Sequence, residues 1–392
     1  MDILKRAREI QPEVVANRRY LHQHPELGFD LDNTVRFVKE KLTEMGYVPL
    51  DCGDHGVVAT VGGKHGGKCI LIRGDMDALP MAEESGLDFA SLRGDAAHTC
   101  GHDTHTATLL GAAKILKEME DELPGTVKLM FQPAEELCAG ARSMLEDGVL
   151  ENPKVDAAFG THIMAMLESG KVAYAPGPMF ASCDLFTITV KGHGGHGSQP
   201  QTSIDPIVVG AHLITALQTI NAREVAPSDI AVLTIGCFQA GSACNIIPES
   251  AKLMGSIRSF DADVRAFVKQ RLIEITEGTV KTFRATADIE FMNETGPVVT
   301  DKGVMQSLGD AVAAVLGEEH MIRDLAPFSG SEDFGYITAA VPAGFFAIGG
   351  SPKDYPALPQ HNPRIRFDED AFVNGVATYV AGAVGWLEAN RE

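Results

Sequence analysis

Residues 69–79 have the sequence CILIRGDMDAL, in which a short apolar run leads directly into two aspartates, Asp75 and Asp77. Further short apolar runs occur at 56–61, 126–131 and 155–160. Helical patterns over 103–120 and 137–147 separate the later runs. Short buried strands that alternate with helices indicate a layered α/β sheet.

A different pattern begins near residue 180. Strand-like segments occur at 184–192, 229–238, 251–260 and 285–292, with helical segments at 205–222 and 263–283. Their order, strand-helix-strand-strand-helix-strand, is that of the split βαβ motif. The predicted fold class is therefore α/β, with a central sheet flanked by helices and an inserted βαββαβ domain.

This change of pattern also predicts the domain boundaries, because 392 residues are enough for two domains. We expect the first half of a catalytic domain at 1–180, an inserted lid and dimerisation domain at 181–294, and the second half of the catalytic domain at 295–392. A βαββαβ sheet leaves edge strands that are available for pairing across a two-fold axis. We therefore expect a homodimer, or a higher homo-oligomer, through the inserted domain.

The composition excludes several classes of partner. A formal net charge of -20 argues against nucleic acid, since phosphate contacts need clustered Lys and Arg. We find no apolar run long enough to span a bilayer, and the charged N-terminal segment lacks the apolar core of a signal peptide. Seven irregularly spaced cysteines do not suggest a disulfide framework. We expect a cytoplasmic protein with neither a nucleic-acid nor a membrane partner.

The stretch AHTCGHDTH, residues 97–105, concentrates three histidines, a cysteine and a carboxylate. The chain has no CxxC, so a zinc finger is excluded, as is a zinc nucleobase deaminase. Cys100 and His102 lie at i and i+2 in a predicted loop ahead of a helix. In extended backbone such side chains point the same way, so both are candidate ligands of one metal site, although loop histidines are often only hydrogen-bonded.

Other strand ends carry similar chemistry. Glu135 and Glu136 follow the apolar run 126–131, and His162 follows the run 155–160. Active sites of open α/β sheets collect at the carboxyl ends of strands, although Glu is also favoured at a helix N-terminus by the dipole. Mixed N, O and S ligands suit Zn, Mn, Co or Ni better than Ca or Mg, for one ion or a pair. A free carboxylate beside metal-activated water is the arrangement of a hydrolase.

Seven motifs, in chain order, carry a specific resemblance: RYLHQHPELGF, RGDMDALPM, HTCGHDTHTATLLGAA, FQPAEE, GHGGHGSQP, SEDFGY and HNPR. Together they resemble the amidohydrolase branch of the aminoacylase, acetylornithine deacetylase and carboxypeptidase G metallopeptidase superfamily. That branch includes hippurate hydrolases, N-acyl-amino-acid deacylases and indole-acetyl-amino-acid hydrolases. The resemblance covers nearly the whole chain, the inserted domain included.

The resemblance implies two divalent metal ions, with Cys100 as the bridging ligand. The remaining ligands that it implies are His102, Glu136, His162 and His361. Glu135 matches the general base, and Asp77 matches a carboxylate behind the metal site. His196 resembles the histidine that steadies the developing oxyanion, which in relatives reaches the site from the partner subunit.

Three further residues are candidates for substrate binding. Asn245 and Arg258 are candidates for holding a substrate carboxylate, the arginine through a bidentate pair, although both also fit ordinary loop and strand positions. Glu332 is expected to line the site. We expect His98 and His105, beside the ligands, to have a structural role or to support the ligands from behind, and we expect a surface position for His22 and His24 at the end of the first helix.

The most strongly indicated function is metal-dependent hydrolysis of the amide bond of N-acyl amino acids, by metal-activated water with Glu135 as the base. A dipeptidase or metallocarboxypeptidase with the same site is the alternative enzyme, and a metal-binding scaffold is the non-enzyme alternative. Glu135 argues against the scaffold, which has no use for a free carboxylate beside its ligands. Leu137 and Cys138, and the segment after His162, depart from the branch's usual glycines and proline, so the substrate is left open.

Overall fold

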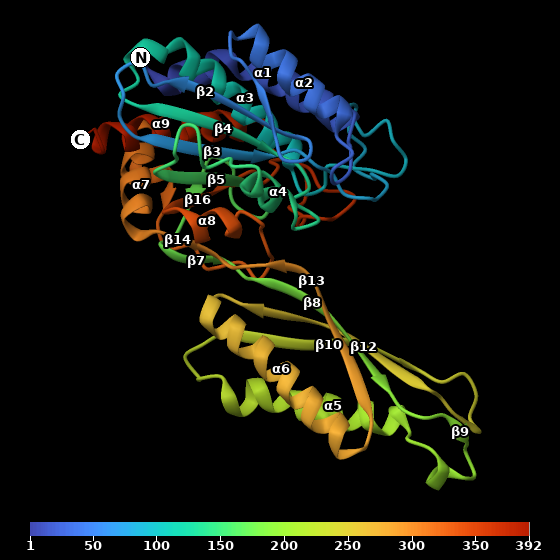
Figure 1. The fold of residues 1–392 in the computed structure, drawn as a ribbon. Helices are drawn as coiled ribbons and strands as arrows, with labels where there is room; N and C mark the ends of the chain where they lie inside the picture. The colour runs from blue at the N-terminus through green and yellow to red at the C-terminus, as the bar shows by residue number, and fades with distance from the viewer. Residues whose placement is uncertain (392) are drawn as a thin grey trace. The chain divides into compact units, whose positions relative to one another are not determined.

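The structure is a computed structural model that describes residues 1–391. The chain forms two compact units (Figure 1). Unit 1 comprises Met1–Met179, Val299–Pro327 and the chain from Tyr336 onward, and unit 2 comprises Phe180–Val298 and Phe328–Gly335. The short stretch Phe328–Gly335 thus groups with unit 2, although it follows the chain's return to unit 1.

Unit 1 is built on an eight-stranded sheet with the order β1-β2-β4-β3-β5-β16-β6-β15. Its strands are β1 (Leu50–Cys52), β2 (Gly56–Gly62), β3 (Cys69–Asp75), β4 (Thr126–Gln132), β5 (Ala157–Met164), β6 (Val172–Ala173), β15 (Met321–Ile322) and β16 (Ala343–Gly349). The central strands β4, β3, β5 and β16 are parallel to one another. Their side chains are buried almost throughout, because helices cover the sheet, and this explains their continuous apolar runs.

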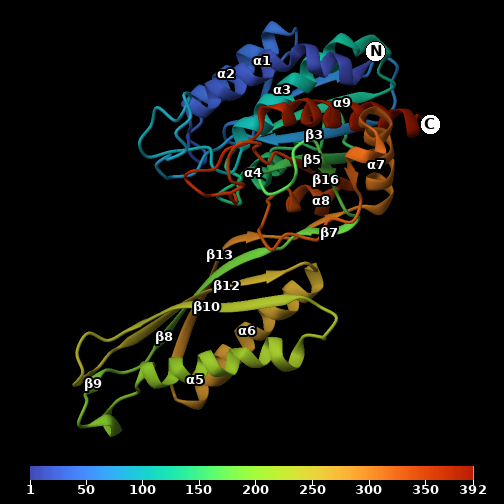
Figure 2. The same cartoon turned by 180° about the vertical axis from the view of Figure 1, so that it is seen from behind.

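The helices of unit 1 form the outer layers of this sheet (Figures 1 and 2). They are α1 (Ile3–Gln23), α2 (Asp32–Glu44), α3 (His102–Glu118), α4 (Gly140–Glu146), α7 (Lys302–Leu316), α8 (Gly335–Ala340) and α9 (Phe372–Ala389). Helices α1, α3 and α9 pack against one another, and α3 and α9 lie on β3. Among residues 1–391, no helix has both the length and the apolar character that crossing a membrane requires.

Unit 2 contains a four-stranded antiparallel sheet with the order β10-β12-β8-β13. Its elements are β8 (Cys183–Lys191), α5 (Pro206–Thr219), β10 (Ala231–Ala240), β12 (Ser250–Ser259), α6 (Ala262–Thr282) and β13 (Thr286–Thr295). The two helices pack on the sheet around buried residues such as Ile188, Leu213 and Leu253. This is the predicted strand-helix-strand-strand-helix-strand order, and the predicted α/β class with an inserted βαββαβ sheet is confirmed.

Two small two-stranded sheets complete the fold. One pairs β9 (Gly195–His196) with β11 (Ile246–Ile247) in unit 2. The other pairs β7 (Gly177–Phe180) with β14 (Val298–Thr300), which contain the points where the chain passes from one unit to the other and back.

The packing of α3 between α1 and α9 depends on a helical glycine. A Cβ at Gly111 would lie 2.8 Å from Val14 Cγ2 and 2.9 Å from Val376 Cγ2. Gly111→Val should therefore lower the free energy of unfolding by about 1–3 kcal/mol, as overpacked cores do. Urea denaturation followed by circular dichroism measures this change.

Gly278 on the exposed side of α6 is the matched control, because a Cβ there meets nothing within 4 Å. Gly278→Ala should raise the stability of its unit by about 0.5–1 kcal/mol, since alanine loses less backbone freedom in a helix. A Gly111→Val variant as stable as the wild type would show that the three-helix layer is not closely packed.

Candidate active site

Polar side chains of unit 1 collect where its parallel strands end. Asp77 follows β3, Glu135 and Glu136 follow β4, and His162 is one of the last residues of β5. The carboxyl ends of parallel strands lie at the same edge of a sheet, so residues distant in sequence become neighbours there. Cys100 and His102, which precede and begin α3, are brought to this edge, as is His361 from the loop after β16.

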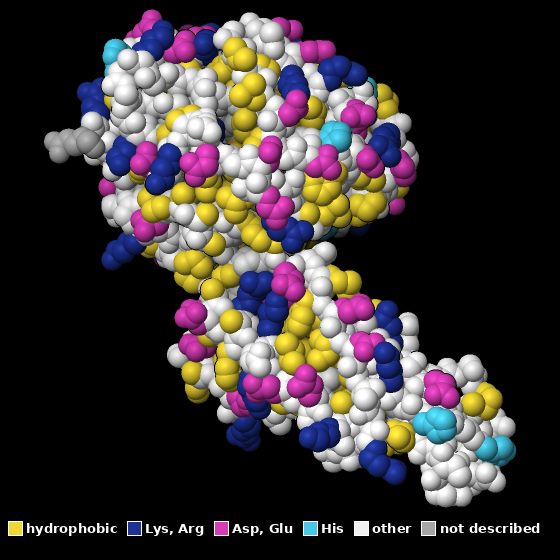
Figure 3. All heavy atoms as spheres, in the orientation of Figure 1, with side chains coloured by type: hydrophobic (Ala, Val, Ile, Leu, Met, Phe, Trp, Pro, Cys, Tyr) yellow, Lys and Arg dark blue, Asp and Glu magenta, His cyan; other side chains and the backbone are white. Residues whose placement is uncertain are grey.

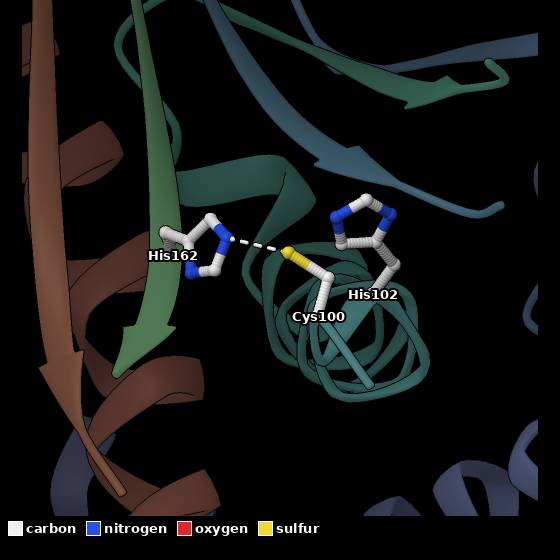
Figure 4. A group of neighbouring side chains, drawn as sticks. All are labelled: Cys100, His102 and His162. Atoms are coloured by element: carbon white, nitrogen blue, oxygen red, sulfur yellow. Dashed lines mark hydrogen bonds between the residues drawn. The ribbon is translucent and has the colours of Figure 1, made fainter. Parts of the chain in front are cut away.

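The five predicted ligands form two groups that share one residue. Cys100, His102 and His162 place one ligand atom each within 4.8 Å of one another, and so do Cys100, Glu136 and His361. Cys100 Sγ is 3.3 Å from His162 Nε2, and His361 Nε2 is 3.4 Å from Glu136 Oε1. Figure 4 shows the Cys100 thiol between the two imidazoles of the first group. The sharing of Cys100 is the arrangement that a bridging ligand requires.

The donor atoms of this cluster fit a divalent cation. His102 Nε2 and Glu136 Oε1 are buried and have no hydrogen-bond partner among residues 1–391. The carboxylate oxygens nearest His102 Nε2 all lie beyond hydrogen-bond distance: Asp75 Oδ2 at 3.7 Å, Glu135 Oε2 at 3.8 Å and Glu136 Oε1 at 3.9 Å. Buried polar atoms are rarely left unpaired, so their convergence with a thiol and further imidazoles is the mark of a site for a metal that takes mixed N, O and S ligands.

The protonation of the cluster is strongly perturbed by burial and by close contacts. Burial raises the pKa of the Cys100 thiol and lowers the pKa of His162 well below its usual value. The close approach of Cys100 and Glu136 raises the pKa of His361 to about 10. Protons therefore occupy part of the cluster in the absence of metal, and metal binding must displace them.

Asp77 holds this cluster together from behind. Its side chain is 1% exposed, and its Oδ1 accepts hydrogen bonds from His102 Nδ1 at 3.3 Å and from the Glu135 backbone N–H at 3.0 Å. Its Oδ2 accepts from the Glu136 N–H at 3.2 Å. One carboxylate thus orients the imidazole of His102 and the backbone of both glutamates, as hydrogen-bonding partners behind metal ligands do.

Glu135 lies beside the cluster but outside both groups that share Cys100. Its side chain is buried, and its Oε2 is 3.8 Å from His102 Nε2. The turn that presents it begins at Ala134, a non-glycine residue with φ 49°. His361 also has a left-handed backbone, with φ 67°, and its N–H donates to the carbonyl of Thr99, which ties its loop to the Cys100 segment.

One buried network next to the site was missed by sequence analysis. His22 was expected at the surface, and this is wrong: it is 3% exposed, with Nδ1 2.7 Å from Asp103 Oδ2 and Nε2 3.0 Å from Glu83 Oε1. Arg18 Nε donates to the same Asp103 oxygen at 2.8 Å. Because α1 packs on α3, its inner face is buried, and the i, i+4 spacing of Arg18 and His22 was the signal that both lie on that face.

Unit 2 brings two of the remaining candidates together. His196 lies on β9, and its Nδ1 is 2.8 Å from Ser198 Oγ. The carbonyl of Asn245 accepts from the Gly197 N–H at 2.8 Å, and both His196 and Asn245 line a hollow of about 600 Å³. In the space-filling view, the part of unit 2 that carries β9 shows histidine side chains on a surface with few charges (Figure 3).

Arg258 and Glu332 lie elsewhere in unit 2. Arg258 is near the end of β12, eight residues after Ser250, which corresponds to about 27 Å of strand from the end that adjoins β11. Its Nη1 is buried and has no hydrogen-bond partner among residues 1–391. Glu332 is buried and accepts from the Phe334 N–H at 3.0 Å. Within one chain, Arg258 is therefore not a neighbour of His196 and Asn245.

A mixed sheet whose parallel central strands carry a cluster of thiol, imidazole and carboxylate groups at their carboxyl ends is the arrangement of a metal-binding hydrolase. The chain belongs to peptidase family M20/M25/M40, whose model matches residues 71–383. The resemblance drawn from the seven motifs is thereby confirmed.

Individual relatives are similar over most of their length. The chain is 37% identical over 384 residues to an N-acetyl-L-cysteine deacetylase of Bacillus subtilis (strain 168). The alignment covers 98% of this chain and 90% of that protein. It is 40% identical over 310 residues to an N-acyl-L-amino acid amidohydrolase of Geobacillus stearothermophilus, covering 78% and 83%. The crystal structure of the Bacillus subtilis YXEP protein, a dinuclear metal-binding peptidase of family M20, matches with a TM-score of 0.83 and 34% identity over 97% of this chain and 99% of that one.

The position of Asp77 leads to a prediction about metal affinity. Asp77→Ala leaves the His102 imidazole and the backbone of both glutamates without their common acceptor. Metal affinity should fall about 10–100-fold, as it does when such partners are removed. Equilibrium dialysis followed by elemental analysis measures the metal retained.

Asp95→Ala is the control, since Asp95 is an exposed aspartate paired with Arg93. It should bind metal like the wild type. Equal metal retention in the two variants would contradict the role given to Asp77.

Proposed function

We propose that this protein hydrolyses the amide bond of N-acyl amino acids, releasing a carboxylic acid and a free amino acid. The observation that carries the proposal is the buried Glu135 carboxylate, 3.8 Å from His102 and adjacent to two ligand groups that share Cys100. The names of the relatives from Bacillus subtilis and Geobacillus stearothermophilus point to the same class of substrate.

Two divalent ions would be held by the two groups, with Cys100 common to both. Zn, Mn, Co and Ni all suit this mixture of donors, and the donors alone do not select one of them. When bound, such ions polarise an amide carbonyl and make water more acidic.

Glu135 carries the proton through the reaction. One of its carboxylate oxygens takes a proton from the attacking water, whose oxygen forms a bond to the carbonyl carbon. The same carboxyl group then gives this proton to the amide nitrogen as the C–N bond breaks, so the amine leaves neutral. Its burial keeps this proton exchange away from bulk water.

The remaining residues recognise the substrate. The unpartnered Nη1 of Arg258 supports a role in binding the substrate carboxylate. His196 would donate to the oxyanion that develops on the carbonyl oxygen, with Asn245 beside it and Glu332 in the lining of the site. Within one chain, Arg258 is separated from the His196 end of unit 2 by roughly 27 Å of β12. An acyl amino acid is much shorter than this, so one substrate molecule does not reach Arg258 and His196 of the same chain. This supports the assignment of His196 to the site of a partner subunit.

The surface of unit 2 supports a second copy of this chain as that partner. Residues 206–222 and 230–248, which include α5 and β10, contain no Asp, Glu, Lys or Arg, although 22% of the chain is charged. β10 is an edge strand of its sheet, with Val232 46% exposed and Phe238 38% exposed. An uncharged edge strand is suited to pairing with the same strand of another copy.

The test of the proposed reaction is release of amine from acetyl, benzoyl and longer acyl amino acids. Dipeptides belong in the panel, because the chain is also 34% identical over 394 residues to thermostable carboxypeptidase 1 of Saccharolobus solfataricus. We expect hydrolysis of acyl amino acids to stop after chelation and to return when Zn, Mn, Co or Ni is restored. Hydrolysis that survives complete removal of metal would contradict the proposal.

Glu135→Gln supplies the matched variant for this assay. It removes the proton acceptor and leaves the groups that share Cys100 intact, so we expect wild-type metal content with turnover lowered about 10²–10⁴-fold. Near-normal turnover, or loss of the metal, would reject Glu135 as the base.

The role of His196 across subunits is tested by mixing variants. His196→Ala and Glu135→Gln should each be inactive alone, but after unfolding and refolding together their heterodimers contain one complete site. Mixed Glu135→Gln and Asp77→Ala serve as the control, since both changes lie in the same cluster and should not complement. Absence of recovery in the first mixture, with heterodimers demonstrated by sedimentation, would place His196 in the site of its own chain.

A further inference from the structure

His105 lies behind the proposed metal ligands and belongs to neither group that shares Cys100. It is in the first turn of α3, and its side chain is buried. Its ring centroid is 5.5 Å from that of His102 and 4.6 Å from that of His162, so it is packed against both ligand imidazoles. The sequence predicts a structural or supporting role for His105, but it does not say which groups the imidazole holds or which ligand it supports.

The ladder between β3 and β5 ends before the ligand on β5 is reached. The register pairs Ile70 with Ala157 and continues only as far as Arg73 and Gly160, whereas β5 extends to Met164. A buried N–H beyond that point needs another acceptor. Ile163, the residue after His162, donates its N–H to His105 Nε2 at 2.8 Å. The imidazole thus takes the place of the missing neighbouring strand.

This contact determines which ring nitrogen of His105 carries the proton. Because Nε2 accepts, Nδ1 must be the protonated nitrogen, and it lies 2.5 Å from Asp75 Oδ1. The other oxygen of Asp75 is 2.7 Å from Arg73 Nη1, and Arg73 Nε donates to Gln132 Oε1 at 2.8 Å. Arg73 and Asp75 are fully buried, and each compensates the charge of the other.

The same peptide controls the orientation of the neighbouring ligand. His162 Nδ1 donates to the carbonyl of Ile163 at 2.6 Å, which leaves Nε2 directed at Cys100 Sγ. Gln360 Nε2 donates to that carbonyl as well, at 2.8 Å. Both backbone groups of Ile163 are therefore hydrogen-bonded to side chains: its N–H to His105, and its carbonyl to His162 and Gln360.

We propose that His105, supported by Asp75 and Arg73, is a positioning residue that fixes the Ile163 backbone and thereby aims Nε2 of His162 at the metal cluster. The inference rests on the proposed metal-dependent reaction for its functional consequence. Asp75, His102 and His105 are close enough to resemble a further metal site, but Asp75 is already engaged by Arg73 and His105. Their role is to orient a ligand.

Two substitutions of His105 each keep one of its two hydrogen bonds and remove the other. Gln reaches the position of Nε2 and retains an acceptor for the Ile163 N–H. Asn reaches only the position of Nδ1, so it retains a donor for Asp75 and leaves the Ile163 N–H unpaired. We expect His105→Asn to lower metal affinity about 10–100-fold, and His105→Gln to retain most of it.

Two readouts are needed, and one of them does not depend on metal or on activity. Equilibrium dialysis with Zn or Mn gives the affinity of each variant. Hydrogen exchange of the metal-free protein, followed by mass spectrometry of peptides that cover 157–164, reports whether the Ile163 N–H is held. Exchange should be faster in His105→Asn than in His105→Gln or the wild type.

Tyr379→Phe is the matched control. The buried Tyr379 hydroxyl donates to the Arg73 carbonyl at 2.6 Å and accepts from Thr161 Oγ1 at 2.9 Å, so its loss disturbs the same strands and leaves the Ile163 N–H bonded to His105. It should lower the Tm and leave metal affinity unchanged. Asp75→Asn is a second variant, for use if His105→Asn folds poorly. The asparagine keeps an acceptor oxygen for His105 Nδ1 but places a neutral group opposite Arg73. The metal affinity of Asp75→Asn should therefore fall as well.

The outcomes distinguish the inference from the proposed function. Wild-type metal affinity and wild-type exchange in His105→Asn would overturn the positioning role while the hydrolase stands. Equal loss of affinity in His105→Gln and His105→Asn, or an equal loss in Tyr379→Phe, would also overturn it. A wild-type protein that binds no metal would instead defeat the proposed function, and the exchange data would still decide whether His105 holds Ile163.

Discussion

The site depends on one geometric constraint, the shared edge at which the parallel strands of unit 1 end. The sheet order β4-β3-β5-β16 makes neighbours of segments that are far apart along the chain. Side chains that follow these strands converge because parallel strands have the same direction, and the helices on the sheet exclude water from the positions behind them. The candidate site is thus a consequence of strand order, and the segments that carry Cys100 and His361 complete it at the same edge.

A second constraint is the cost of burying the polar groups that hold these ligands. Asp75, Asp77 and Asp103 are all nearly inaccessible to solvent, in a chain whose net charge is -20. Each has a specific partner: Arg73 for Asp75, Arg18 for Asp103, and backbone N–H groups with an imidazole for Asp77. Breaking such a pair leaves an uncompensated buried group, so the supporting network is as sensitive to substitution as the ligands that it orients.

Much of the fold, and many of the residues that cluster at the candidate site, could be predicted from the sequence. Continuous apolar runs predicted the buried strands at the centre of unit 1. The spacing of apolar residues predicted the strand-helix-strand-strand-helix-strand order of unit 2. The motifs that carry the family resemblance named Cys100 and His361 together, and the structure brings both into one group. The burial of His22 was missed because it depends on which face of α1 meets α3; the i, i+4 spacing places Arg18 and His22 on one face but does not say that this face is buried.

The sequence by itself determined which donor atoms are available and in what order the strands and helices that carry them occur, since apolar periodicity and ligand chemistry are local properties. Only the tertiary structure decided how those atoms are held. The role of His105 arises because the β3–β5 ladder stops at Gly160 and leaves the Ile163 N–H to be satisfied by a side chain from another element. Strand register and helix packing are set by contacts between distant segments, and no local pattern records where a ladder ends.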